Sequence, residues 1–126
     1  MLLLPTGCLF YLAEQMAQVD TLGEFEQVVL LAILRLKDNA YGFTIGAEIA
    51  ARTGRKPSPG ALYATLDRLE SKGFVASRVG DPTPVRGGRA KRFFDVTGSG
   101  VDAVARAQRA YQSLLDGLVL PGVVHA

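Results

Sequence analysis

The segment "SPGALYATLDRLESKGF", from Ser58 to Phe74, holds the signals that decide the fold of this chain. Ser58 is a favoured helix N-cap, and Pro59 has the φ angle of a first helical residue already set by its ring. Its leucines recur at spacings of three and four, which predicts one apolar face: Leu62, Leu66 and Leu69. Gly73 is a C-terminal stop signal. The segment therefore predicts an amphipathic helix with its own start and end.

Two further helices are predicted before this one. The apolar segment that starts near Gly23 and ends before the turn formers Asp38 and Asn39 predicts a mostly buried helix. The segment "TIGAEIAARTGR", residues 44–55, predicts a second helix, with Thr44 as N-cap and Gly54 as its stop.

A hairpin and a long helix are predicted after it. Two strand-like runs, Phe74–Val79 and Lys91–Val96, are joined by the Gly- and Pro-rich link "GDPTPVRGGRA". The last helix is expected from Thr97, its N-cap, to about Leu118.

This order of elements predicts a fold that is mainly α with a small β-hairpin: a winged helix-turn-helix plus a long C-terminal dimerisation helix. We expect residues 1–22 to form a helical N-terminal extension, residues 23–97 the winged helix-turn-helix domain, and residues 98–126 the C-terminal helix and tail. In such a fold the helix that starts at Ser58 is the candidate for the DNA major groove.

The charge of the 126-residue chain is unevenly distributed. The net charge is only +2, but residues 52–92 hold ten Lys or Arg against three acidic residues. A basic middle between acidic flanks is typical of a polyanion-binding face, although ordinary variation of surface charge gives a similar pattern.

Several functions find no support in the composition. Cys8 is the single cysteine and His125 the single histidine, so a thiolate cluster, a multi-histidine metal site and a histidine-based triad are not expected. We therefore expect no enzyme activity, no cofactor, no metal and a cytoplasmic location. The apolar N-terminus resembles neither a signal peptide nor a membrane span, because Glu14 interrupts it and no Lys or Arg precedes it.

The last helix carries a heptad-like seam that indicates a partner helix in a homodimer. The seam consists of Val101, Val104, Gln108, Tyr111, Leu115 and Leu118. The alternative is that some of these side chains pack on the first helix of their own chain.

Three blocks, in this order and spacing, resemble the PadR family of transcriptional regulators: "VVLLAILRL…YGFTIGAEI", "SPGALYATLDRLESKGFVASR" and "GGRAKRFFDVTGSG". The resemblance implies a dimeric winged-helix protein, usually a repressor. It also implies DNA contacts from the recognition helix and the wing, at Ser58, Gly60, Ala61, Tyr63, Thr65, Arg86, Arg89 and Lys91. Phe43 stands where the family often has tyrosine, and Tyr41 is the substitute that we consider. The chain has no Trp, so drug binding between tryptophans is not implied.

The residues themselves give the same contacts a physical reason. Small residues at positions 58, 60 and 61 let a helix N-terminus approach a phosphate, Tyr63 could donate to a phosphate, and Thr65 could meet a base edge. Lys56 precedes the helix and Arg68 follows along it. Strand alternation lets only one of Lys91 and Arg92 face DNA, and we choose Lys91. The alternative is that Ser58 only caps a helix and that the charges are merely solvated.

Together these observations predict a sequence-specific DNA-binding transcriptional regulator, a repressor that binds a pseudo-palindromic operator as a homodimer. A cavity between the long helices could hold a small apolar effector, whose identity no residue indicates. The alternative function is a winged-helix protein-interaction module whose basic wing binds an acidic partner.

Overall fold

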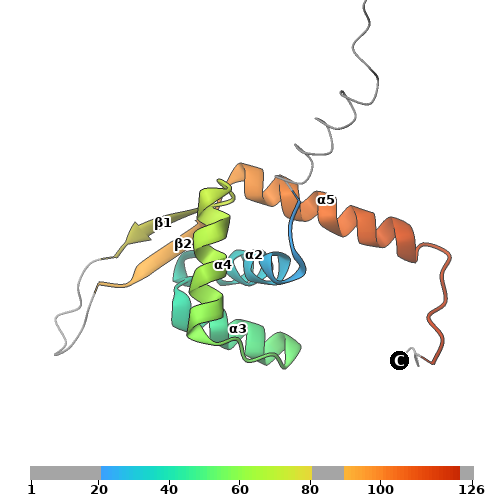
Figure 1. The fold of residues 1–126 in the computed structure, drawn as a ribbon, viewed down its shortest axis with the longest axis horizontal. Coiled ribbons are helices and arrows are strands. Elements are labelled where there is room, and N and C mark those ends of the chain that lie inside the picture. Colours follow the sequence, from blue (N-terminus) through green and yellow to red (C-terminus); the bar gives the residue numbers. More distant parts are fainter. Residues whose placement is uncertain (1–20, 81–89, 123–126) are drawn as a thin grey trace, which may run out of the picture.

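The computed structural model describes residues 21–80 and 90–122. Its elements, in chain order, are α2 (Glu24–Leu36), the 3-10 turn η1 (Lys37–Asn39), α3 (Gly42–Thr53), α4 (Pro59–Ser71), β1 (Val75–Val79), β2 (Arg92–Val96) and α5 (Gly98–Leu115) (Figure 1). The predicted fold class is confirmed: the described residues form helices and one antiparallel hairpin, which extends to one side of the helices (Figure 1).

Two of the predicted helix starts are confirmed by their caps. Ser58 Oγ accepts a hydrogen bond from the Ala61 amide at 3.1 Å, and Thr97 Oγ1 accepts one from the Gly100 amide at 3.1 Å. Each cap satisfies an amide that has no partner inside its helix.

Two predicted helix bounds are wrong. Helix α3 begins at Gly42 rather than after Thr44, because the Thr44 hydroxyl instead accepts from the Tyr41 amide at 3.0 Å and donates to the Asn39 carbonyl at 2.6 Å. Helix α5 ends at Leu115 rather than near Leu118, since Asp116 is extended and Gly117 has a φ of 74°. A positive φ suits glycine and does not continue a helix.

Helix α2 is the centre of the core. It packs against α3, α4, β2 and α5, so its apolar residues point in several directions. The core consists mainly of Val29, Leu30, Ile33, Ile45, Ile49, Leu62, Leu66, Leu69, Phe94 and Val104, all buried. Burial of these side chains supplies most of the free energy of folding.

The base of the hairpin is fixed to the helices. Val75 pairs with Val96 and Val79 with Arg92 in an antiparallel register. The Phe94 amide donates to the Ala40 carbonyl at 2.8 Å, and a β-bridge joins Tyr41 to Phe93. The hairpin therefore starts from a defined position beside the start of α3.

Helix α5 starts on the body of the domain and then projects away from it (Figure 1). Thr97 donates its hydroxyl to the Gly73 carbonyl at 2.7 Å and its amide to the Phe74 carbonyl at 2.9 Å. Gly100, Ala103 and Val104 are buried, whereas residues 109–122 are exposed. Among the described residues, no helix combines the length and apolar character needed to cross a membrane.

The start of α5 generates a stability prediction. A methyl group at Gly100 would overlap the Phe74 carbonyl oxygen and come within 2.7 Å of Val96 Cγ1, whereas one at Gly98 would meet nothing within 4 Å. We expect Gly100→Ala to lower the free energy of unfolding by about 1–3 kcal/mol, and Gly98→Ala to leave it unchanged or raise it slightly. Urea denaturation of both variants at one protein concentration tests this. Equal effects of the two substitutions would contradict the close packing of α5 on Phe74.

Candidate nucleic-acid interface

The N-terminus of α4 presents small, exposed residues. Ser58, Gly60 and Ala61 are exposed, and no atom lies within 4 Å of the position that a Gly60 side chain would take. The side chain of Ser58 satisfies the Ala61 amide, while the partial positive charge of the helix start faces solvent. A phosphate could approach the backbone here without meeting a large side chain.

Tyr63 joins this surface to the start of α3. Its side chain is half-exposed, and its hydroxyl occupies the space that a side chain at Gly42 would need. Because Gly42 has no side chain, the Tyr63 ring can lie across the first turn of α3. The hydroxyl is therefore held between the two helices, next to the buried Gly42.

The structure corrects the interpretation of Thr65. The residue is 2% exposed, its hydroxyl donates to the Ala61 carbonyl at 2.9 Å, and it accepts from Arg68 Nη2 at 3.1 Å. The prediction that Thr65 meets a base edge is therefore wrong, because its side chain lies on the core side of α4. The exposed face of α4 instead carries Ala61, Ala64 and Arg68.

Tyr41 and Lys91 come together although they are far apart in the sequence. Lys91 Nζ lies 4.5 Å from the centre of the Tyr41 ring, a cation–π contact. The Tyr41 ring in turn meets Phe93 edge-on, at 5.5 Å between ring centres. The wing base thus places an exposed ammonium group beside the start of α3.

Arg92 points to the other side of the same strand. Its guanidinium group contacts Glu70 at 2.9 Å and Asp67 at 3.5 Å, and it lies over the Phe94 ring. Arg92 therefore ties β2 to α4, whereas Lys91 has no acidic partner within the described part of the chain. This division follows from the alternation of side chains along a strand.

The basic residues before α4 also differ in their partners. Arg55 contacts Glu24 at 2.7 Å and lies over the Phe25 ring, and Arg52 contacts Glu48 at 3.2 Å. Lys56 is exposed and makes no ion pair within residues 21–80 and 90–122. Lys56 is thus the cation of this turn that remains available to an outside ligand. Arg86 and Arg89, the predicted wing contacts, lie outside the described residues.

The C-terminal end of α4 is anchored to α2. Lys72 Nζ donates to both carboxylate oxygens of buried Glu26, at 2.8 and 2.9 Å, and the Gly23 amide donates to the same carboxylate at 2.7 Å. Burial alone would raise the pKa of Glu26, but these donors outweigh it and hold the pKa below its ordinary value. The ion pair therefore fixes the angle of α4 on the core.

The predicted seam on α5 divides into two parts. Val104 is buried in the core of its own chain, so its assignment to a dimer seam is wrong. Val101, Tyr111, Leu115 and Leu118 are exposed, and Gln108 contacts Gln27 of α2 at 3.5 Å. Spacings of three and four connect the buried Gly100 and Val104 to an exposed apolar stripe on α5: Tyr111, Leu114 and Leu115. Leu118 lies beyond the end of α5, so its place in a helical seam is not supported.

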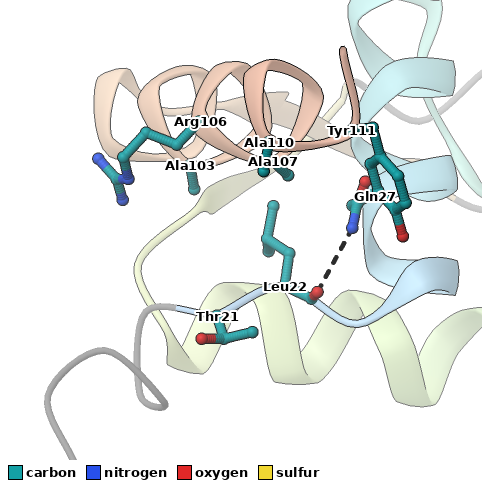
Figure 2. Close-up of a pocket in the computed structure, with 8 residues that line it drawn as sticks. All are labelled: Thr21, Leu22, Gln27, Ala103, Arg106, Ala107, Ala110 and Tyr111. Carbon is teal, nitrogen blue, oxygen red and sulfur yellow. Dashed lines mark hydrogen bonds between the residues drawn. The ribbon is translucent and has the colours of Figure 1, made fainter. Parts of the chain in front are cut away.

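A cavity of 570 Å³ lies between α5 and the segment that precedes α2. Figure 2 shows the Leu22 side chain pointing toward three alanines of α5, with Gln27 donating to the Leu22 carbonyl at 3.4 Å. The cavity is lined by Thr21, Leu22, Gln27, Ala103, Arg106, Ala107, Ala110 and Tyr111. It lies beside the stripe of α5 and away from the N-terminus of α4.

Comparisons with known proteins agree with this geometry. The model of the transcriptional regulator PadR-like family matches residues 30–106. The transcriptional regulator Rv3488 of Mycobacterium tuberculosis is 41% identical over 66 residues, which are 51% of this chain and 56% of that protein. The match therefore spans little more than half of that relative.

Solved structures share the fold. A PadR family transcription regulator from Clostridium difficile is 25% identical with a TM-score of 0.58, over 74% of this chain and 96% of that one. A PadR-like transcription factor from Bacteroides fragilis has a TM-score of 0.62 at 19% identity, over 85% of this chain and 94% of that one. At 19% identity, the comparison with the Bacteroides fragilis protein shows a shared fold and nothing more.

Ser58 generates a prediction that separates stability from binding. Ser58→Ala removes the cap and is expected to lower the free energy of unfolding by about 1 kcal/mol. Ser58→Asp keeps an equally good cap but adds a negative charge, so we expect unchanged stability and about tenfold weaker binding to duplex DNA at low salt. Thermal unfolding and fluorescence anisotropy measure the two effects. If Ser58→Asp bound duplex DNA as tightly as the wild type, the start of α4 would not be part of the interface.

Proposed function

The chain belongs to the PadR-like family of transcriptional regulators, and on that premise we propose that it binds double-stranded DNA sequence-specifically as a homodimer and represses transcription from a pseudo-palindromic operator. One observation carries the proposal: Lys56 precedes the small, exposed start of α4, and Lys91 lies against Tyr41 at the start of α3, which Tyr63 of α4 contacts; neither lysine has an acidic partner among the described residues. A helix start near such cations suits a phosphate backbone.

We assign the contacts to two kinds. Those expected to meet phosphates and sugars are Tyr41, Lys56, Ser58, Gly60, Tyr63, Arg86, Arg89 and Lys91. Ala61 and Arg68, on the exposed face of α4, are expected to read base edges, because alanine suits a thymine methyl and arginine suits guanine. In this proposal Thr65 supports Arg68 from the core side rather than touching DNA.

The homodimer is supported by α5. The stripe of Tyr111, Leu114 and Leu115 continues the core-facing side of the helix beyond the body of the domain, where its own chain leaves it exposed. Soluble monomers rarely expose so continuous an apolar surface. A second copy would cover it and set two α4 helices about one DNA turn apart. The cavity beside α5 is our candidate site for a small apolar effector.

The dimer has a direct test. We expect sedimentation equilibrium to give twice the chain mass of 13.5 kDa, and Leu115→Glu to reduce it to a single chain because a charge would be buried in the seam. Ser113→Glu, on the opposite side of α5, is the matched control and should remain dimeric. A monomeric wild type at micromolar concentration would contradict the proposal.

DNA binding is tested by selecting duplexes from a randomised pool and measuring anisotropy against a shuffled control at several salt concentrations. We expect tighter binding to the selected duplex, and a steep fall of affinity with salt, at about 0.9 logarithmic units per phosphate contact. Lys91→Ala should weaken binding to all duplexes alike and reduce the salt slope by about one contact.

Arg92→Ala is the control for Lys91, because Arg92 is already paired with Glu70 and Asp67. We expect it to leave the salt slope unchanged. No binding to any duplex at low salt would instead favour the interaction module that binds an acidic protein partner. Transcription in vitro from a promoter that carries the selected site then distinguishes repression from activation.

A further inference from the structure

We propose that Phe43, at the rim of an apolar cleft beside the start of α4, recognises a thymine in the DNA site by packing against its C5-methyl group. The inference rests on the proposed function and adds a specificity-determining residue to it. Phe43 is the second residue of α3, and it is 77% exposed. In the sequence, Phe43 is notable only because it lacks the hydroxyl of the tyrosine that the PadR family often has at this position.

The cleft has a volume of 390 Å³ and separates α3 from the start of α4. Phe43, Gly46 and Ala47 line one side, and Pro57, Pro59 and Tyr63 line the other. The small residues of α3 leave the space open, since a methyl group at Gly46 would meet nothing nearer than Leu62 Cδ2, at 3.8 Å. An apolar group of methyl size could therefore enter beside the Phe43 ring.

The charges near the cleft favour a polyanionic occupant. Lys56 is the chain neighbour of Pro57, which lines the cleft, and Lys91 lies over the ring of Tyr41, two residues before Phe43. An apolar cleft near two cations that make no ion pair among the described residues suits a polyanion that carries an apolar group at its edge. In the major groove of DNA that group is the C5-methyl of thymine, which side chains such as phenylalanine contact directly.

The second copy of the chain is a less suitable occupant. Helix α3 lies near the N-terminal end of α4, whereas α5 starts near its C-terminal end and runs away from α4 (Figure 1). A dimer built on α5 therefore leaves Phe43 uncovered, on the same surface as Ser58 and Gly60. Contact with DNA would remove the Phe43 ring from water, which is favourable for an aromatic side chain of this size.

The test combines a base change with a side-chain change. Each thymine of a selected duplex is replaced in turn by deoxyuridine, which lacks only the methyl group. For the wild type we expect one position per half-site at which the replacement weakens binding about five- to tenfold. Phe43→Ala should weaken binding to the unmodified duplex by a similar factor and should show no further loss at that position.

Phe43→Leu is the conservative variant and should keep part of the preference for thymine. Thermal unfolding of both variants should match the wild type, because the side chain is exposed. Additive losses, or an equal loss on shuffled DNA, would overturn the proposal and indicate a sugar contact at most. Failure of the wild type to bind any selected duplex would overturn the proposed function as well, so the two failures are distinguishable.

Discussion

The burial of α2 is the constraint on which the remaining structure depends. Its apolar side chains cover so much of its circumference that α3, α4, β2 and α5 must all pack around it. Even Glu26, a charged residue in the first turn of the helix, is buried, and it is stable there only because Lys72 and the Gly23 amide satisfy its carboxylate. One buried helix therefore determines where both α4 and the long helix α5 begin.

The two ends of α4 serve different purposes. At its C-terminal end, the charges are neutralised by neighbours: Lys72 by Glu26, and Glu70 by Arg92 of the hairpin. At its N-terminal end, the residues are small, the cap is made locally, and the nearby cations Lys56 and Lys91 are unpaired among the described residues. Ion pairs thus hold one end of the helix in place, and the other end is left to meet a ligand.

Local signals in the sequence were sufficient for much of this arrangement. The cap at Ser58, the alternation of Lys91 and Arg92, and the order of helices and strands all follow from short-range chemistry. Tertiary packing decided the rest. Spacing alone does not show that the buried leucine face of α4 is wide enough to include Thr65, or that Val104 packs in the core of its own chain. The exposure of Phe43 and its cleft depend on Tyr63 and the prolines before α4, residues that no periodicity relates to it.

The junction between β1, β2 and α5 has a consequence for evolution. Thr97 is bonded to the carbonyls of Gly73 and Phe74, and Gly100 lies directly on the Phe74 carbonyl, so α5 cannot pivot relative to α4. In a dimer joined through α5, the crossing angle of the two long helices would determine the distance between the two half-sites. Each base pair added between half-sites rotates one of them by about 35°, which this junction could not absorb. Operator spacing and the residues of the α5 seam would therefore have to change together among relatives.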